Sequence, residues 1–119
     1  MLERSDLMRF PELVPDKVCT TPISLTIEGE GLDKDGAPSI AFQGDLMCNW
    51  QDGGKVRFTN QEKIIEVSGR AYFNGDIVPD ISNIVAGSAI IFGELREIDH
   101  GYKRRNVDGT VNYTEITFK

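Results

Sequence analysis

The side chains best suited to acid–base or nucleophilic catalysis are sparse in this chain. His100 is the single histidine, and it lies between an expected hairpin and a basic run. Catalysis near neutral pH most often relies on a histidine held by a partner group, whereas this position predicts a solvated side chain in a turn. No serine stands in a G-x-S-x-G motif, and neither cysteine has a histidine close by in the sequence. We therefore expect a protein that is not an enzyme and uses no cofactor.

Metal-ligating patterns are equally weak. Cys19 and Cys48 belong to no CxxC or cysteine–histidine cluster, so a zinc site is not indicated, and we expect two free thiols. The run Asp33-Lys34-Asp35-Gly36 is similar to the start of a calcium-binding loop. An alanine and a proline then follow where a further ligand would be needed. The run therefore predicts a turn, and no metal site.

The charge of the chain is acidic and unevenly distributed. Its 13 basic and 19 acidic residues give a net charge of −6 at neutral pH. All of this excess lies before residue 94, because residues 94–119 contain five charges of each sign. Tight, sequence-independent binding of nucleic acid depends on neutralising phosphates. An acidic surface therefore argues against such binding, although it is compatible with a position beside DNA.

The amino-terminal residues 1–17 form a separate unit. Leu2, Leu7, Met8 and Phe10 could form one face of a short helical turn, which Pro11 would end. So short a helix is unstable alone, so this arm must dock on its own domain or on a neighbour. The early acidic residues argue against a signal peptide, and no run of ~20 apolar residues indicates a membrane span. We expect a cytoplasmic protein without a membrane partner.

Residues 18–119 follow the pattern of a single mainly β domain. Apolar residues alternate with polar ones, as in half-buried strands, and glycine and proline mark the breaks. The expected strands are residues 21–28, 39–50, 63–73, 88–92, 95–99 and 110–118. Residues 77–87 read as a connection with one helical turn, and Gly93-Glu94 as a hairpin turn. About six short antiparallel strands of this kind predict a small β-barrel or sandwich.

Two further segments carry polar residues on expected loops. Asp52-Gly53-Gly54-Lys55 is rich in glycine, but it lacks the spacing of a phosphate-binding loop and no helix is expected after it. Lys103-Arg104-Arg105 is a basic cluster beside Tyr102, and acidic surroundings weaken its field. We interpret the cluster as a solvated turn, or as one side of an acid–base contact with a neighbouring subunit.

The order of several short motifs resembles that of a known family. Gly75-Asp76-Ile77 follows a strand, and the hairpin of residues 89–98 comes next. Residues 103–115, KRRNVDGTVNYTE, resemble a closing hairpin of the form R-N-x-D-G-T-x-N-Y, with Val107 where a proline is usual. The runs Cys48-Asn49-Trp50 and Val67-Ser68-Gly69 add to the likeness. Together, residues 20–119 resemble the head–tail connector proteins of tailed bacteriophages and prophages, in the small head-closure or stopper class.

The resemblance implies a structural role in the virion. Members of this class form rings between the portal–adaptor complex and the tail, and packaged double-stranded DNA passes through without sequence-specific binding. The expected partners are copies of the same chain, an adjacent adaptor protein and a tail-end protein. An extended loop gates the channel in stopper-like members. The candidate gating residues are therefore Asp33, Lys34, Asp35, Gly36, Asp52, Gly53, Gly54 and Lys55. The candidate inter-subunit contacts are Lys103, Arg104 and Arg105.

Two alternatives remain open at this level. A nucleic-acid-binding module of the OB type could stack bases on Trp50, Phe58, Tyr72 and Phe73, although the acidic charge opposes it. A small enzyme or ligand-binding barrel would need a concave site with converging titratable groups.

Overall fold

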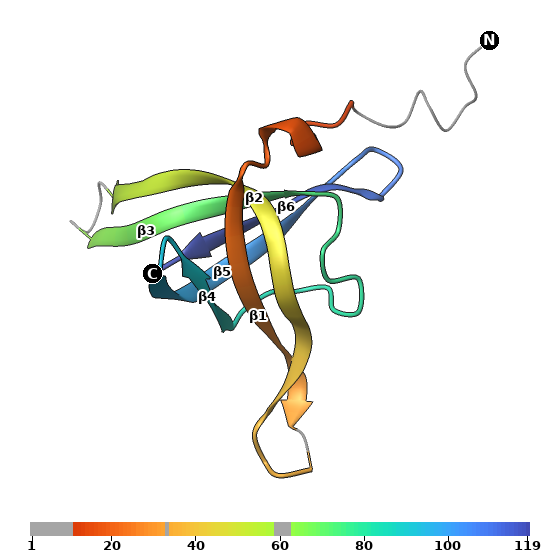
Figure 1. The fold of residues 1–119 in the computed structure, drawn as a ribbon, viewed down its shortest axis with the longest axis vertical. Coiled ribbons are helices and arrows are strands. Elements are labelled where there is room, and N and C mark those ends of the chain that lie inside the picture. The colour runs from red at the N-terminus through yellow and green to blue at the C-terminus, as the bar shows by residue number, and fades with distance from the viewer. Residues whose placement is uncertain (1–10, 33, 59–62) are drawn as a thin grey trace.

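Six strands form a closed barrel, and several of them are longer than the alternation of the sequence suggests (Figure 1). The computed structural model describes residues 11–32, 34–58 and 63–119, and for 54–58 and 63–67 it describes the backbone alone. The elements in chain order are a 3₁₀ turn η1 (Asp16–Val18), β1 (Thr21–Leu32), β2 (Pro38–Phe58), β3 (Lys63–Asn74), β4 (Gly87–Ile91), β5 (Glu94–Arg105) and β6 (Val111–Phe118). The prediction of a mainly β fold, a small barrel or sandwich of about six antiparallel strands, is confirmed, and of the two the structure has the barrel.

The barrel is built from two antiparallel three-stranded units. Its order is β1-β2-β3-β6-β5-β4, with β4 pairing back to β1. Every strand pair is antiparallel. Because β3 and β4 are not neighbours, residues 75–86 must cross from one unit to the other. This crossover contains no helical turn, contrary to the expectation for residues 77–87, and only Ile84 forms a bridge, to Gly101.

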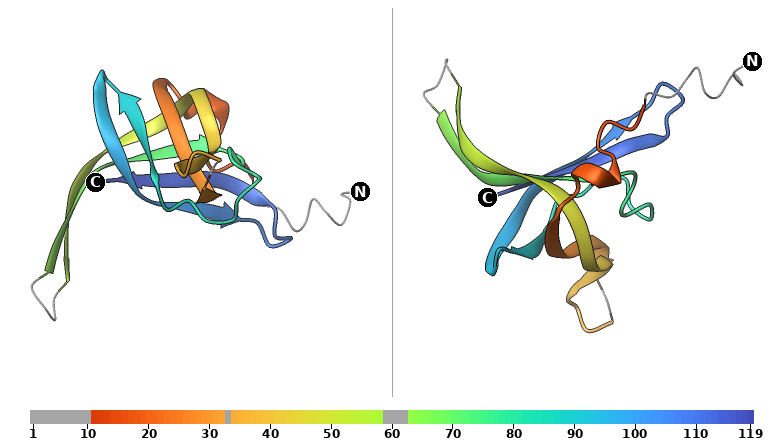
Figure 2. Two further views of the ribbon diagram at one scale, coloured as in Figure 1. Left: turned by 90° about the horizontal axis from the view of Figure 1, so that it is seen from below. Right: turned by 45° about the horizontal axis from the view of Figure 1, so that its top comes forward.

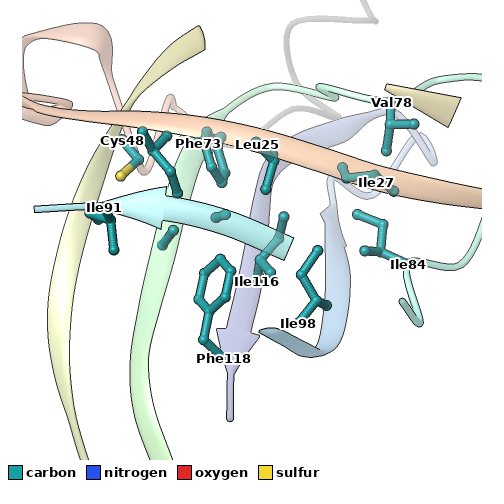
Figure 3. Packing of buried hydrophobic residues seen from close by; sticks show 13 residues of the cluster. Leu25, Ile27, Cys48, Phe73, Val78, Ile84, Ile91, Ile98, Ile116 and Phe118 are labelled. Carbon is teal, nitrogen blue, oxygen red and sulfur yellow. The ribbon is translucent and has the colours of Figure 1, made fainter. Parts of the chain in front are cut away.

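The core consists of the inward rows that the alternation predicts (Figure 3). Ile23, Leu25 and Ile27 of β1 are fully buried, and they belong to the same cluster as the aromatic rings of Phe73 and Phe118. The remaining buried members come from β2 to β6 and from the crossover: Cys48, Ala71, Val78, Ile84, Ala89, Ile91, Ile98 and Ile116. Burial of such side chains stabilises a fold by about 1.5–3 kcal/mol each. Ile40, in the expected strand of residues 39–50, is exposed, because β2 has left the barrel at that point.

Strand β2 runs for 21 residues and takes part in two hairpins that extend beyond the barrel (Figures 1 and 2). Its first part pairs with β1, and its last part pairs with β3 from Asn49↔Tyr72 to Phe58↔Lys63. The prediction of a loop at residues 51–55 is therefore wrong. Two consecutive glycines are tolerated here because the segment continues a two-stranded ribbon away from the packed core.

Strand β5 also differs from the expectation. Residues 100–105 belong to this strand and not to a turn, since β5 pairs with β6 as far as Arg105↔Val111. An irregularity between Ile98 and His100 interrupts the alternation, which hides the continuity of the strand in the sequence. The tight turn before β5 has Phe92 and Gly93 at its centre, one position earlier than expected.

Residues 11–18 are attached to the end of the barrel where β6 begins. The side-chain amide of Asn112 donates to the Pro11 carbonyl at 3.0 Å, and its oxygen accepts from the Leu13 N–H at 3.0 Å. Asn49 donates to the Val18 carbonyl at 3.0 Å. The expected helical turn of residues 1–10 lies outside the described residues. No helix in the described part of the chain has the length and apolar character needed to span a bilayer.

Candidate assembly surfaces

The basic cluster of residues 103–105 is divided between the inside and the outside of the barrel. Lys103 points inward, and only 5% of its side chain is exposed. Its ammonium donates to the Asp76 carboxylate at 3.1 Å and to the Val78 carbonyl at 2.8 Å, and it also donates to the Ile81 carbonyl. Lys103 thus fastens the crossover to β5. It has no free donor for a neighbouring subunit, so its expected role in an inter-subunit contact is wrong.

The other two members of the cluster remain on the surface. The Arg104 side chain is 48% exposed, with its guanidinium 3.6 Å from the Glu115 carboxylate and 4.7 Å from the centre of the Tyr102 ring. Arg105 donates to the Gly109 carbonyl at 2.8 Å within the β5–β6 turn. Exposed ion pairs of this kind contribute little to folding. Both guanidinium groups therefore remain open to a partner.

The first set of gating candidates lies at the tip of the β1–β2 hairpin. Lys34, Asp35 and Gly36 are exposed there, and Gly36 has a φ of 84°. This left-handed conformation favours glycine, as expected for a turn. Asp33 lies outside the described residues. The hairpin projects well beyond the barrel (Figure 1).

The second set lies on the β2–β3 ribbon. Asp52 pairs with Gly69, Gly54 with Val67 and Lys55 with Glu66, so Asp52, Gly53, Gly54 and Lys55 belong to one strand of the ribbon. Residues 59–62, between β2 and β3 in the sequence, lie outside the described residues. These candidates are thus not on a loop, although they do belong to an extension of the barrel.

Trp50 fixes the base of the β2–β3 ribbon. Its ring centre lies 5.7 Å from that of Phe118, and the Arg96 guanidinium lies 5.4 Å above the indole. Gly69 on the paired strand makes room for the ring, since a Cβ atom there would lie 2.1 Å from the indole. Gly69, in the middle of β3, therefore has a packing role. It allows an aromatic clamp where the ribbon leaves the barrel.

A polar hollow of about 350 Å³ surrounds His100. Its wall includes Ser82, Asn83 and the outer edge of β5, and the His100 ring lies 4.6 Å from the Tyr102 ring. No carboxylate is among the described residues that line it. Within the part of the chain that the structure describes, no group of three histidine, cysteine or acidic residues could hold a metal ion. The geometry around His100 thus supplies no partner that would orient it for proton transfer.

No protein-family model and no curated protein matches the sequence.

Both cysteines are buried free thiols. Burial raises the pKa of the Cys48 thiol to about 12, and the nearby Cys19 adds to this shift. Burial also raises the pKa of Cys19. Because the thiolate is the reactive form, both side chains act as small apolar residues at neutral pH.

The aromatic residues proposed for base stacking do not share one surface. Phe73 is buried in the core, and Trp50 packs on Gly69 and Phe118. Tyr72 is partly exposed, with its ring 6.1 Å from that of Tyr113. The Phe58 side chain lies outside the described part of the structure. Phe73 is therefore unavailable to a ligand, which corrects that part of the base-stacking set.

One surface was not anticipated from the sequence. Five apolar residues point outward at the end of β1, β2, β4 and β5 where the β4–β5 turn lies. We call them the outer apolar patch: Pro22, Met47, Ile90, Phe92 and Leu95, all exposed. The sequence contains a signal for this patch in the alternation of β4. Ala89 and Ile91 are buried, so Ile90 between them points outward, and Leu95 is paired with Ile90 on the same face. Because residues 89–92 are all apolar, the sequence does not show which of them point outward.

Proposed function

We propose that this chain is a non-enzymatic virion protein, a subunit of a head–tail connector ring of the stopper or head-closure type. In this role it joins the portal–adaptor complex to the tail and lets packaged double-stranded DNA pass or holds it back. The observation that carries the proposal is the pair of ribbons that leave the closed barrel on one continuous strand. The order of the motifs in residues 20–119, which resembles that of the head–tail connector family, is the second support for the proposal.

The ribbons favour a protein that functions in an assembly. A two-stranded ribbon is marginally stable in water, and unpaired strand edges invite further pairing. Among the described residues, β3 has no partner for 63–68 on the side away from β2, since β6 begins to pair at Gly69. Similarly, β1 pairs with β4 only from Ser24 to Ile27, so among the described residues the rest of β1 has no strand partner on that side. Neighbouring subunits in a ring would cover these edges.

The charge of the subunit suits a DNA channel. A net charge of −6, repeated around a ring, repels phosphates and keeps DNA free to slide. The exposed Arg104 and Arg105 are the groups we assign to contacts with acidic residues of an adjacent ring. Lys34, Asp35 and Gly36, at the tip of the β1–β2 hairpin, are the preferred gating segment, because they extend furthest from the packed core among the described candidates.

Deletion of the gene from an inducible prophage that carries it tests the proposal. We expect DNA-filled heads and separate tails in electron micrographs, and restoration of joined particles by the gene supplied in trans. Mass spectrometry of purified wild-type virions should detect the chain. Normal virion yield after deletion, or absence of the chain from virions, would refute the proposal.

A charge-reversal variant tests the surface assignment separately. Arg104→Glu with Arg105→Glu should reduce head–tail joining without loss of folding, because both side chains are solvent-exposed. The matched control is Lys119→Glu, a change of one exposed cation at the end of the chain. Normal joining by the double variant removes these residues from the contact. Binding of single-stranded DNA at low salt by the purified chain would favour the OB-type alternative instead.

A further inference from the structure

The polar hollow beside β5 has a rim that is held in place at both ends. At one end, Gly101 donates its backbone N–H to the Ile84 carbonyl at 2.8 Å. The crossover can approach this closely because Gly101 has no side chain, since a Cβ atom there would lie 2.5 Å from Ile84. At the other end, the Ile81 carbonyl accepts from the buried ammonium described above. Ser82 and Asn83 lie between these two anchors, are exposed and line the hollow, so the rim is pre-formed.

The β5 wall of the hollow has more hydrogen-bond donors than it uses. His100, Tyr102 and Arg104 alternate along the outer face of the strand. The Arg104 guanidinium has five donors, and the Glu115 carboxylate, 3.6 Å away, lies beyond hydrogen-bond length. Arg105 uses a donor within the β5–β6 turn. In the part of the chain that the structure describes, both guanidinium groups therefore keep donors for a ligand.

The hollow is basic although the molecule is acidic. Three cations line it, namely Lys103, Arg104 and Arg105, and its described lining contains no carboxylate. Asp76 and Glu115 lie next to two of the three, which leaves one positive charge in a chain whose net charge is −6. A polyanion such as DNA, with one charge per ~1.7 Å of helix axis, would be repelled by the rest of this surface. The charge therefore favours an anion of low total charge.

The aromatic rings on this wall offer little surface to a nucleic-acid base. The Tyr102 ring lies 4.6 Å from the His100 ring and 4.7 Å from the Arg104 guanidinium. These two neighbours precede and follow Tyr102 by two residues on the same face of the strand, so they cover the phenol ring from opposite sides. Base stacking needs an open aromatic face. The wall thus presents donors to an oxyanion, and no stacking platform.

The edge of β5 beside the hollow is open to an extended chain. Among the described residues, β4 pairs with β5 only as far as Glu97, and the bridge of Ile84 to Gly101 follows. From Tyr102 to Arg105, β5 has β6 on one side and no strand on the other. Such an edge accepts a peptide as an added strand, with main-chain hydrogen bonds for affinity and alternate side chains for specificity. Every second side chain of that peptide would lie on the same outer face as the rings.

We propose that this hollow binds a carboxylate side chain on an extended segment of the protein in the adjacent ring. The inference rests on the proposed connector function and names the chemistry that its exposed arginines recognise. Arg104 and Arg105 donate to the carboxylate, Ser82 and Asn83 line the opposite side, and the main chain of the segment follows the free edge of β5. A volume of about 350 Å³ is at the lower end of the ~300–1,000 Å³ of ligand pockets, which suits one acidic side chain with its flanking residues.

Titration of the ¹⁵N-labelled full-length protein with the capped peptide acetyl-TEVET-amide tests the site. The two glutamates of this peptide lie on one side when the chain is extended. We expect saturable NMR shifts at the amides of Ser82, Asn83, Tyr102 and Arg104, with a dissociation constant of about 0.1–1 mM. The amide of Gly36, at the tip of the β1–β2 hairpin, should not move. The peptide acetyl-TQVQT-amide, which lacks the carboxylates, should bind at least about tenfold more weakly.

A pair of single variants separates binding from folding. Arg104→Gln should weaken binding of the glutamate peptide about tenfold, because a charge-assisted hydrogen bond is lost. Lys34→Gln is the matched control, an exposed cation at the hairpin tip, and it should bind like the wild type. Both melting temperatures should stay within about 2 °C of the wild type, since both side chains are solvent-exposed. Equal affinity of the two variants, or no shifts at residues 82–83 and 102–104 with about 5 mM peptide, would overturn the inference.

Two other outcomes would assign the hollow to a different occupant and would also overturn the inference. Tighter binding of an oligodeoxythymidine of about ten nucleotides than of the peptide, with shifts at residues 100–105, would assign it to single-stranded nucleic acid. Shifts at these residues that depend on protein concentration, with no peptide present, would assign it to a second copy of this chain. Because the titration uses purified protein, its failure leaves the virion test above unaffected.

Discussion

Replacement of Lys103 by methionine should destabilise the barrel strongly, although the sequence places this residue in an exposed basic cluster. Methionine keeps the length and apolar stem of lysine and removes only the ammonium group. The Asp76 carboxylate, 25% exposed, and the carbonyls of Val78 and Ile81 would then lose their donor. The substitution thus isolates the connection between the crossover and β5.

The magnitude follows from the burial of these groups. Removal of one partner of a buried ion pair costs ~3–5 kcal/mol, and partial exposure of Asp76 favours the lower end. We expect a loss of about 3 kcal/mol in the free energy of unfolding, since hydrogen bonds to charged groups contribute ~1.5–3 kcal/mol. For 119 residues the entropy of unfolding is about 0.25 kcal/mol/K, so the melting temperature should fall by about 12 °C.

Urea unfolding followed by tryptophan fluorescence measures the change, because Trp50 is the single tryptophan and packs in the barrel wall. Arg105→Met is the matched control from the same cluster, and it should change stability by less than ~0.5 kcal/mol. Addition of Asp76→Asn to Lys103→Met should recover part of the loss, because it removes the unpaired carboxylate. A loss below about 1 kcal/mol for Lys103→Met, or equal losses for both single variants, would refute a clamping role.

Two further predictions concern packing and ionisation. Gly69→Ala should lower the free energy of unfolding by about 1–3 kcal/mol through overpacking, because the added Cβ would lie 2.1 Å from the Trp50 ring. Gly44→Ala is the control, since its Cβ would lie 3.4 Å from Phe42. Equal urea midpoints for the two variants would contradict the packing of Trp50 on Gly69. Burial raises the pKa of Cys48 from 9.0 to about 12. Between these pH values the thiol keeps its proton in the folded state but ionises in the unfolded state. The free energy of unfolding should therefore fall as the pH rises from 9 towards 12. The melting temperature of Cys48→Ala should fall less over this range, and parallel curves would show that the thiol is not responsible.

The alternation of the sequence was sufficient for the core but not for the length of the strands. Ile23, Leu25 and Ile27 are buried as predicted, because a period of two leaves one face of a strand apolar. The ribbons escaped prediction since they have no buried face to impose that period. The glycines at 53 and 54 then resembled a loop, whereas pairing to β3 keeps this segment extended.

The candidate site was harder to predict because one irregularity shifts the phase of β5. The bulge near Ile98 and His100 turns Lys103 inward and leaves Arg104 outward, which three adjacent basic letters do not reveal. The acceptors of Lys103 lie 22 to 27 residues earlier in the sequence, so no local pattern indicates them. The outer apolar patch depends on register between β1, β2, β4 and β5, which is a property of the folded chain.

The β1–β2 extension contributes almost nothing to the packed interior, and this frees its length from the requirements of folding. Leu32 and Ile40 near its tip are 70% and 54% exposed, so the barrel does not depend on them. Residue pairs inserted or removed there keep the side-chain phase of both strands. The reach of the projection can therefore change in steps of about 7 Å per two residues, which would let one barrel carry projections of different length.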